Sequence, residues 1–497
     1  MDWQSLKATY DNPRGMSDRS KRLMALSRVL DGTQYDSLPN DFMVERNGAG
    51  EYVPLMQRRP SVRTNLCRTV VDDSVSLLFG DTHWPTLCAD DETTEEALNA
   101  FSCCVGLPAV MTLAATRGSV GSTAILVEIE EGCPILTVLD TAFLTPKWNA
   151  RGCLVSVHER YTVTGQDLVD LGYEIPEDRL RANFWWDRTF DEKNVTVMVP
   201  LEIGSTNSPA VDKERTVEHG WGFVPIIWIR NSEVTGDVAD GQCTFERAID
   251  TVIEADYLLS QGGRALRYAS DPTLVLKAGN DLGQSGPAHQ GGAASAVQLP
   301  PDGDAKLLEI NGKSSDAVLS HYQELRALVL EQVHGNRAHS DKIAAGTSGR
   351  AMEMMCLPLI WLSARLRQSY GDGGLLPLYR MICDMTQKSG VGLTIGGDTF
   401  TSLNADGLSL HWPSWFEPTE PEILALAQGL VTGVDGGLIS NEQACVIFSA
   451  RLGIPNASAE WEKVKLEVSS GTRIAKPPKE TRTDANDGKT SSHQVTA

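Results

Sequence analysis

The sequence predicts an α+β protein whose strands and helices are gathered in separate stretches of the chain. Residues 119–230 contain short runs of β-branched and aromatic residues between turn residues, which is typical of antiparallel strands. From Thr244 onward the apolar residues recur at helical spacing instead. Two helix-start signals within 418–468 then predict a small helical region near the end of the chain.

Length and charge narrow the class of function. The chain has 497 residues, enough for roughly three domains. Its 44 basic and 65 acidic residues give a formal net charge of −21. A protein that wraps DNA by neutralising phosphates is basic, so that class is excluded and any contact with nucleic acid is expected to be loose.

Apolar runs and cysteines indicate a reducing, non-membrane environment. The longest apolar run, 103–115, is too short to span a bilayer, and the N-terminus lacks the apolar segment of a signal peptide. Ten cysteines form no Cys-x-x-Cys pair, and most lie among apolar residues. We therefore expect buried, reduced thiols, a cytoplasmic location and no zinc site.

The N-terminal third predicts a polar arm followed by helices. Residues 1–60 read as an arm with one short helix at 17–30. Residues 61–81 have apolar positions at helical spacing and end at Gly80. The acids within 89–101 favour a helix start over a cation site, because carboxylates stabilise helix N-termini.

The β-rich stretch divides into successive strands. Residues 123–140 read as two strands around a Glu-Glu-Gly turn, and 153–165 as a third strand. His158 in that third strand is expected to pack or to bond locally. The segments FWWDRTF, NVTVMVPLEI and GFVPIIWIR continue the same pattern.

Two long helices are predicted next, at 244–269 and 314–335. The first carries an apolar stripe, and Ser314 or Ser315 can cap the second, which is about 30 Å long. Residues 270–313 between them are rich in Gly, Pro, Ala and Ser, with two strand-like pieces, PTLVLKA and KLLEING. Such a connection is long for a helix pair, which usually needs about 2–8 residues.

The remaining chain alternates loop and helix. A polar segment, 336–348, precedes a long helical stretch in which Pro358 predicts a kink and Gly371–Gly374 a bend or break. Residues 471–497 have almost no apolar side chains and are expected to be disordered. Before them, 418–468 is expected to be helical, with capping boxes that pair Thr419 with Glu422 and Ser440 with Gln443.

No catalytic motif is recognisable. The chain lacks a phosphate-binding GxxxxGK[ST] loop, a GxGxxG fingerprint after a strand and an HExxH zinc motif. Gly346–Gly349 is not a nucleophile elbow, although a Ser348–His339 dyad keeps open a hydrolytic enzyme that uses the 336–349 loop. We expect no catalytic residue, no metal and no cofactor, and a binding or structural role.

The order of these segments resembles that of the portal proteins of tailed double-stranded DNA bacteriophages. NLCRTVVDDSVSLLFGD resembles the family's N-terminal helix ending in Leu-Phe-Gly, and GFVPIIWIRN the strand before its first stem helix. TFERAIDTVIEADYLLS is similar to that stem helix, and SGRAMEMMCLPL to the start of the long wing helix. PTEPEILALAQGLVTGVDGGLISNEQA resembles the crown. The likeness covers about residues 60–468 and departs from the family at Gly371–Gly374.

The resemblance implies a portal-type fold with an antiparallel β/α wing, a two-helix stem, a small α/β clip, a long kinked wing helix and a helical crown. By position these parts are an arm and wing at 1–243, stem helices at 244–269 and 314–335, a clip at 270–313, a tunnel loop at 336–348, a wing helix with its return at 349–417, a crown at 418–470 and a tail at 471–497.

The function implied by the resemblance is that of a ring-shaped channel at one capsid vertex. Twelve copies form the ring, and double-stranded DNA is packaged and ejected through it. The implied partners are the terminase large subunit, a head-completion or adaptor protein that docks on the clip, and the major capsid and scaffold proteins. The implied location is the virion, with assembly in the host cytoplasm. A different oligomeric capsid or scaffold component without a channel remains the alternative.

Two sets of charged residues would face the DNA in such a ring. Arg337, His339 and Lys342 lie in the tunnel-loop segment, where cations can touch the phosphate backbone weakly. Acidic walls repel phosphates and let DNA slide, and the alternative for each acid is a solvated surface. The acids are Glu246, Asp250, Glu254 and Asp256 on the first long helix, and Asp316, Glu324 and Glu331 on the second.

Overall fold

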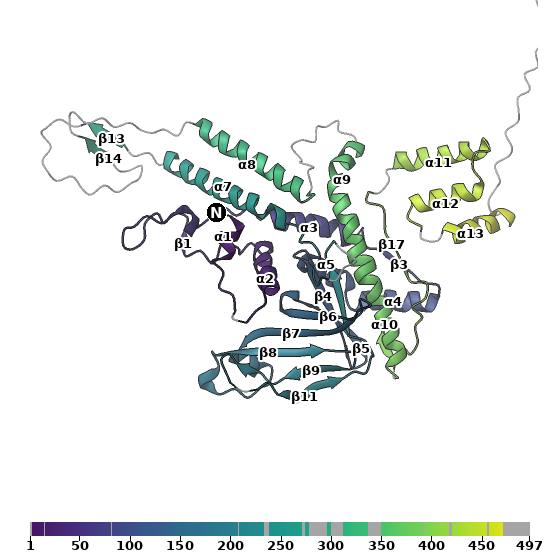
Figure 1. Cartoon of the computed structure of the whole chain (residues 1–497). Helices are drawn as coiled ribbons and strands as arrows, with labels where there is room; N and C mark the ends of the chain where they lie inside the picture. Colours follow the sequence, from purple (N-terminus) through teal and green to yellow (C-terminus); the bar gives the residue numbers. More distant parts are fainter. Residues whose placement is uncertain are drawn as a thin grey trace, which may run out of the picture. The chain divides into compact units, whose positions relative to one another are not determined.

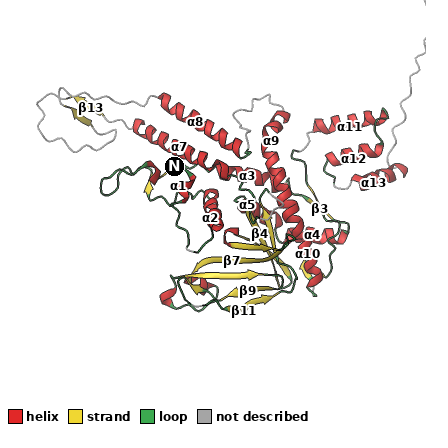
Figure 2. Cartoon of the chain, in the orientation of Figure 1, coloured by secondary structure: helices red, strands yellow, loops and turns green. Residues whose placement is uncertain are grey.

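The computed structural model is an α+β protein, as predicted, and it divides into two compact units, Met1–Trp415 and Phe416–Ala497 (Figures 1 and 2). Among the residues that the structure describes, strands occur only in the first unit and helices occur in both. The structure describes residues 2–13, 15–80, 82–206, 208–232, 238–270, 274–277, 296–299, 312–335, 349–390, 392–416, 420–454 and 457–470.

The N-terminal arm contains the predicted short helix. α2 (Asp18–Leu30) begins at Ser17, whose side chain accepts a hydrogen bond from the Ser20 backbone N–H. The arm is less polar than predicted, because Leu23 and Leu26 of α2 are fully buried in the main core. The other elements of the arm are α1 (Trp3–Lys7), β1 (Asn40–Asp41), a 3-10 turn at Leu55–Gln57 and β2 (Arg58–Arg59).

Three helices follow. The residues predicted to mark helix ends, Gly80 and the acids within 89–101, lie at the end of one helix and the start of the next. α3 (Leu66–Phe79) starts five residues later than the predicted 61–81 span and is followed by Gly80. α4 (Glu92–Cys104) begins after Asp91, whose carboxylate accepts from the Thr94 N–H, so the acids there are helix-start residues as expected. α5 (Leu107–Gly118) completes the group.

The β region is antiparallel, as predicted, and forms two sheets. The smaller sheet has the order β12–β4–β5, with β4 at Ser122–Glu130, β5 at Cys133–Leu139 and β12 at Ile226–Arg230. The predicted turn joins β4 to β5 through Glu131 and Gly132, which both have positive φ (51° and 82°). Hairpin turns with two such residues match the twist of the paired strands.

The larger sheet has the order β11–β9–β8–β7–β6, and β10 pairs with β8. His158 on β7 lies 2.7 Å from Asp187 of the neighbouring strand, so the local bond expected of this histidine is confirmed. The strands are β6 (Leu144–Trp148), β7 (Leu154–Thr164), β8 (Asn183–Phe190), β9 (Asn194–Met198), β10 (Leu201–Glu202) and β11 (Val211–Glu218), with the short helix α6 at Gly165–Asp170.

The two predicted long helices are present as an antiparallel pair (Figure 1). α7 (Ile249–Ser270) follows a 3-10 turn at Glu246–Ala248, and α8 spans Gly312–Gln332. Between them, β13 (Leu274–Lys277) corresponds to the predicted PTLVLKA strand and pairs in parallel with β14 (Ala296–Leu299), which was not predicted. Most of the KLLEING piece lies outside the described residues.

The long helical stretch continues where a break was expected. α9 (Gly349–Leu366) contains Pro358, and the chain then runs through a π-helix, Arg367–Leu375, into α10 (Leu376–Lys388). A Cβ on Gly371 would lie 2.6 Å from Trp412, and one on Gly374 would lie 2.5 Å from Ile229. The glycines therefore permit close packing against the helix. Of the bend or break predicted at Gly371–Gly374, the break is wrong, because the backbone stays helical there as a π-helix. Short strands follow at Leu393–Ile395 (β15), Asp398–Phe400 (β16) and Ser409–His411 (β17).

The cysteines are only partly as expected. All ten are free thiols, and Cys67 and Cys383 are buried. Four others are exposed, which corrects the prediction of buried thiols. They occupy the last turn of α4, the start of β5 and the turn before β7, where side chains extend away from the core. The exposed four are Cys103, Cys104, Cys133 and Cys153.

The second unit contains the predicted helices. α11 spans Glu420–Asp435, α12 spans Asn441–Arg451 and α13 spans Ala457–Ser469. Ser440 caps α12 by accepting from the Gln443 backbone N–H, as predicted. The other predicted cap, Thr419, lies outside the described residues.

Candidate functional site: the α7–α8 helix pair

Contacts at both ends of the pair fix its antiparallel register. Thr251 of α7 lies 3.4 Å from Gln332 of α8, measured between the side-chain oxygens. Near the other end, α8 approaches Gly262 so closely that a Cβ there would lie 2.7 Å from Val318 Cγ1. Gly262 therefore serves the helix contact, since a side chain at this position would push Val318 away. The sequence analysis did not single out this glycine.

The three cations predicted to touch DNA cannot be placed. Arg337, His339 and Lys342 lie outside the described residues, and so does Ser348. Gly335, the last described residue before this segment, is hydrogen-bonded to the end of α8: its N–H donates to the Leu330 carbonyl oxygen.

Two of the predicted acids are engaged with the N-terminal arm. Glu246 forms an ion pair with Arg22 of α2, at 2.6 Å. Asp250 accepts a hydrogen bond from the backbone N–H of Trp3, also at 2.6 Å. Each acid thus has a structural role within its own chain.

Asp256 does not belong to the acidic face, which corrects the prediction. It is fully buried and accepts hydrogen bonds from the Tyr35 hydroxyl at 2.9 Å and from the Thr64 N–H and hydroxyl at 2.8 Å each. Burial raises the pKa of its carboxyl, and the hydrogen bonds from Thr64 and Tyr35 partly offset that rise. The spacing in the sequence indicates that Asp256 leaves the acidic face, because it lies two residues, or about 200°, beyond Glu254 on the helix.

The remaining predicted acids are exposed and lie at a similar level along the pair. Glu254 of α7, and Glu324 and Glu331 of α8, are all exposed. Because Thr251 lies opposite Gln332 and Gly262 opposite Val318, Glu254 lies level with Leu328, which is between the two α8 acids. Glu324 also has His321 as a neighbour, at 3.5 Å. Asp316 is exposed near the opposite end of α8.

Apolar side chains are exposed on the same two helices. Leu266 of α7 and Leu319 of α8 each retain 53% of their surface, and Leu328 retains 44%. Leu328 lies one helical turn from both Glu324 and Glu331, whereas Leu266 and Leu319 lie toward the other end of the pair, and exposed leucines scattered singly are ordinary. The pair therefore combines exposed carboxylates, which repel anions, with an exposed leucine between two of them.

The described residues hold no group of three or more His, Cys, Asp or Glu side chains that could bind a metal ion. Within the same residues, no single helix is long and apolar enough to cross a membrane, although α4 and α5 reach the required length and composition together as a pair bent by 67°. No protein-family model matches the chain, and no curated protein matches it.

Proposed function

We propose that this chain is a portal subunit, and that copies of it form a closed ring around a channel for double-stranded DNA. The observation that carries the proposal is the α7–α8 pair, with its exposed acids Glu254, Glu324 and Glu331 around the exposed Leu328. The order of elements also supports it, since a β-rich body, two antiparallel helices, a polar segment, a long helix and a helical unit follow one another as in the resembling family.

Electrostatics supports a conduit better than a clamp. DNA carries one phosphate charge per about 1.7 Å of helix axis, so a wall that gained energy from each phosphate would hold the duplex still. Carboxylates along the helix pair instead repel the backbone, and the duplex passes without adhering to them. In the proposed ring, Arg337, His339 and Lys342 provide the few weak contacts with the backbone.

The proposal extends to the partners that a portal ring serves. Twelve copies sit at one capsid vertex, where the ring binds the terminase large subunit during packaging and a head-completion or adaptor protein afterwards. The segment between α7 and α8 is the proposed docking region, and the major capsid and scaffold proteins surround the ring. The chain itself acts as a channel and platform, without catalysis.

The mass of the native assembly tests the ring. Native mass spectrometry of the full-length protein should give a discrete species near twelve times 54.0 kDa, and negative-stain images should show rings with a central hole. A monomer in solution and in the presence of capsid components would contradict the proposal. A compact oligomer without a hole would favour the alternative of a capsid or scaffold component.

The DNA contact has a separate test. Arg337→Glu combined with Lys342→Glu should impair DNA packaging or retention and leave the mass of the ring unchanged. Ser348→Ala serves as the matched control in the same segment, and it should package normally. Normal packaging by the charge-reversed protein would remove the tunnel-loop contact from the proposal, whereas loss of a hydrolytic activity in Ser348→Ala would favour an enzyme.

A further inference from the structure

Arg367 is a partly buried cation that has no carboxylate partner among the described residues. It begins the π-helix, and its Nη1–H donates to the Pro413 carbonyl oxygen at 3.0 Å. Its Nε and Nη2 atoms are buried and have no acceptor within the described part of the chain. Burial lowers the pKa of Arg367 to about 10, as expected of a cation that no nearby acid stabilises. A buried donor without an acceptor destabilises the fold, so these two N–H groups call for a ligand.

The two vacant N–H groups form one edge of the guanidinium, and this edge fits a carboxylate. Arg19 holds Asp240 through its Nε and Nη2 atoms, at 2.7 and 2.6 Å. Arg22 holds Glu246 through the same two atoms. Parallel N–H groups of this kind bind both oxygens of a carboxylate at once. Arg367 therefore presents, without a ligand, the edge that binds acids elsewhere in this protein.

A buried hydroxyl lies on the same side of the helix. Ser363 is fully buried, and its Oγ has no hydrogen-bond partner among the described residues. It precedes Arg367 by four residues, so the two side chains lie on one face of the helix, about one turn apart. A serine hydroxyl can donate to a carboxylate as well. Two different side chains on this face thus lack an acceptor.

Two tryptophans cover the guanidinium. The Cζ atom of Arg367 lies 3.3 Å from the ring centroid of Trp415 and 4.9 Å from that of Trp412. Residues 412–415, which we call the strap, are also held by His83, whose Nε2 lies 3.3 Å from the Trp415 carbonyl oxygen. A ring face attracts a cation, but it leaves the Nε–H and Nη2–H groups without an oxygen acceptor. The strap therefore covers Arg367 without satisfying it.

We infer that Arg367 is a binding site for a carboxylate of an acidic peptide segment in a partner protein, and that the strap covers this site until the partner binds. The peptide carboxylate accepts from the Nε–H and Nη2–H groups of Arg367, and the strap moves aside. The strap ends at Trp415, the last residue of the first unit, so its end can move without shifting any later part of that unit. The inference requires neither a ring nor DNA, and it is therefore independent of the proposed function.

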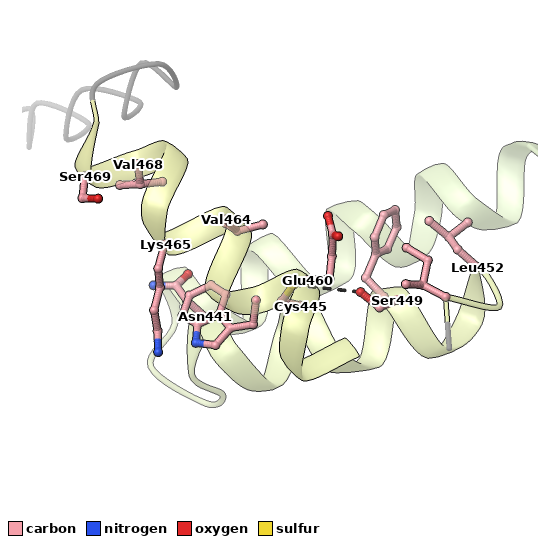
Figure 3. A pocket seen from close by; sticks show the side chains of 12 residues that line it. Asn441, Cys445, Ser449, Leu452, Glu460, Val464, Lys465, Val468 and Ser469 are labelled. Atoms are coloured by element: carbon pink, nitrogen blue, oxygen red, sulfur yellow. Dashed lines mark hydrogen bonds between the residues drawn. The ribbon is translucent and has the colours of Figure 1, made fainter. Parts of the chain in front are cut away.

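An exposed lysine in the second unit is the competing site for an acidic peptide. Figure 3 shows a groove of about 780 Å³ between α12 and α13, which Lys465 lines. Lys465 is paired with Glu462 at 2.7 Å, whereas the edge of Arg367 is vacant. A lysine also lacks the two parallel N–H groups that hold a carboxylate. Lys465→Gln is therefore a control in the test of Arg367.

Fluorescence anisotropy of a labelled peptide tests the site in the full-length protein. The probe is an acetylated hexaglutamate amide, and the hexaglutamine peptide of the same length is its neutral control. The glutamate peptide should bind at least tenfold more tightly. Arg367→Lys keeps the charge but loses the parallel N–H groups, and it should weaken this binding at least tenfold. Arg380→Lys, at an exposed arginine of α10, is the matched control, and it should bind like the wild type, as should Lys465→Gln.

The strap has a separate readout. Trp415→Ala and His83→Ala each loosen the strap, and each should tighten peptide binding about threefold, because a site that is open more often has a higher apparent affinity. Weaker or unchanged binding in both variants overturns the covering role of the strap.

Three results overturn the carboxylate site. They are equal binding of the two peptides, binding by Arg367→Lys that equals the wild type, and displacement of the peptide by inorganic phosphate but not by chloride of equal ionic strength. The last result would assign the site to phosphate. All three leave the proposed ring standing, whereas an Arg367-dependent peptide site in a protein that forms no ring supports the inference and contradicts the proposed function.

Discussion

Two acids of α7 differ by two positions in the sequence and by their entire surroundings. Glu254 is exposed, whereas Asp256 is fully buried beneath the N-terminal arm and accepts three hydrogen bonds from Tyr35 and Thr64. A buried carboxylate is tolerated only when donors replace the lost water. Asp256 is thus a fixed point that ties the arm to the helix.

Removing the buried carboxylate should destabilise the first unit. Asp256→Ala leaves the Thr64 N–H and the Tyr35 hydroxyl buried without their acceptor, and this should lower the free energy of unfolding by about 3 kcal/mol. Glu254→Ala is the matched control on the same helix, with an expected change within about 0.5 kcal/mol. Urea unfolding of both variants measures the difference, and equal effects would contradict the anchoring role.

The same carboxyl gives the stability a dependence on pH. Burial raises the pKa of Asp256 in the folded protein, whereas an unfolded Asp has a pKa of about 3.9. As pH rises between these two values, the folded protein keeps a proton that the unfolded chain has lost, so the free energy of unfolding falls. Asp256→Asn removes this titration. The free energy of unfolding of the wild type minus that of the variant should therefore decrease from about pH 4 upward. An increase of this difference with pH would contradict the raised pKa.

At the scale of the elements, the α7–α8 contact depends on which of two adjacent glycines faces α8. Gly262 has no room for a Cβ beside Val318, whereas nothing lies within 4 Å of a Cβ at Gly263. Alanine favours a helix over glycine by about 1 kcal/mol at either position. Gly263→Ala should therefore slow hydrogen exchange of the α7 amides, and Gly262→Ala should accelerate exchange in both α7 and α8 because the stiff Val318 must move. Equal slowing in both variants would show that α8 does not approach Gly262.

Local signals in the sequence predicted the elements well where neighbours in the chain decide the outcome. Ser440 caps a helix, and the Glu131–Gly132 turn joins a hairpin, because each depends on residues a few positions away. The π-helix through Gly371–Gly374 was missed because its glycines receive Trp412 and Ile229, which are distant in the sequence. The partners of Asp256, Tyr35 and Thr64, are also distant in the sequence, and only its offset of about 200° from Glu254 indicates that it leaves the acidic face.

For the candidate site, the sequence predicted the helix pair and its acids, but not the contacts that these acids make with the N-terminal arm. Helical periodicity places Glu246, Asp250 and Glu254 on one side of α7. It gives no sign that Arg22 and Trp3 reach the first two of them, since those contacts span more than 200 residues. A folded arm thus reduces the acids that face outward on α7, and Glu254 is the one most directly available to an assembly.

At the scale of the whole molecule, the net charge of −21 has a consequence for DNA that can be reversed at chosen positions. If the α7–α8 face borders the duplex, Glu254→Lys with Glu324→Lys should turn a repulsive wall into an adhesive one. The assembled protein should then retain double-stranded DNA at about 50 mM salt and release it toward about 200 mM, because each phosphate contact displaces counterions. Fluorescence anisotropy with labelled duplex measures this retention. The control is Glu128→Lys with Glu130→Lys, which makes the same charge change at exposed positions of β4. Equal DNA binding by both double variants would mean that the acids of the helix pair are ordinary surface charges.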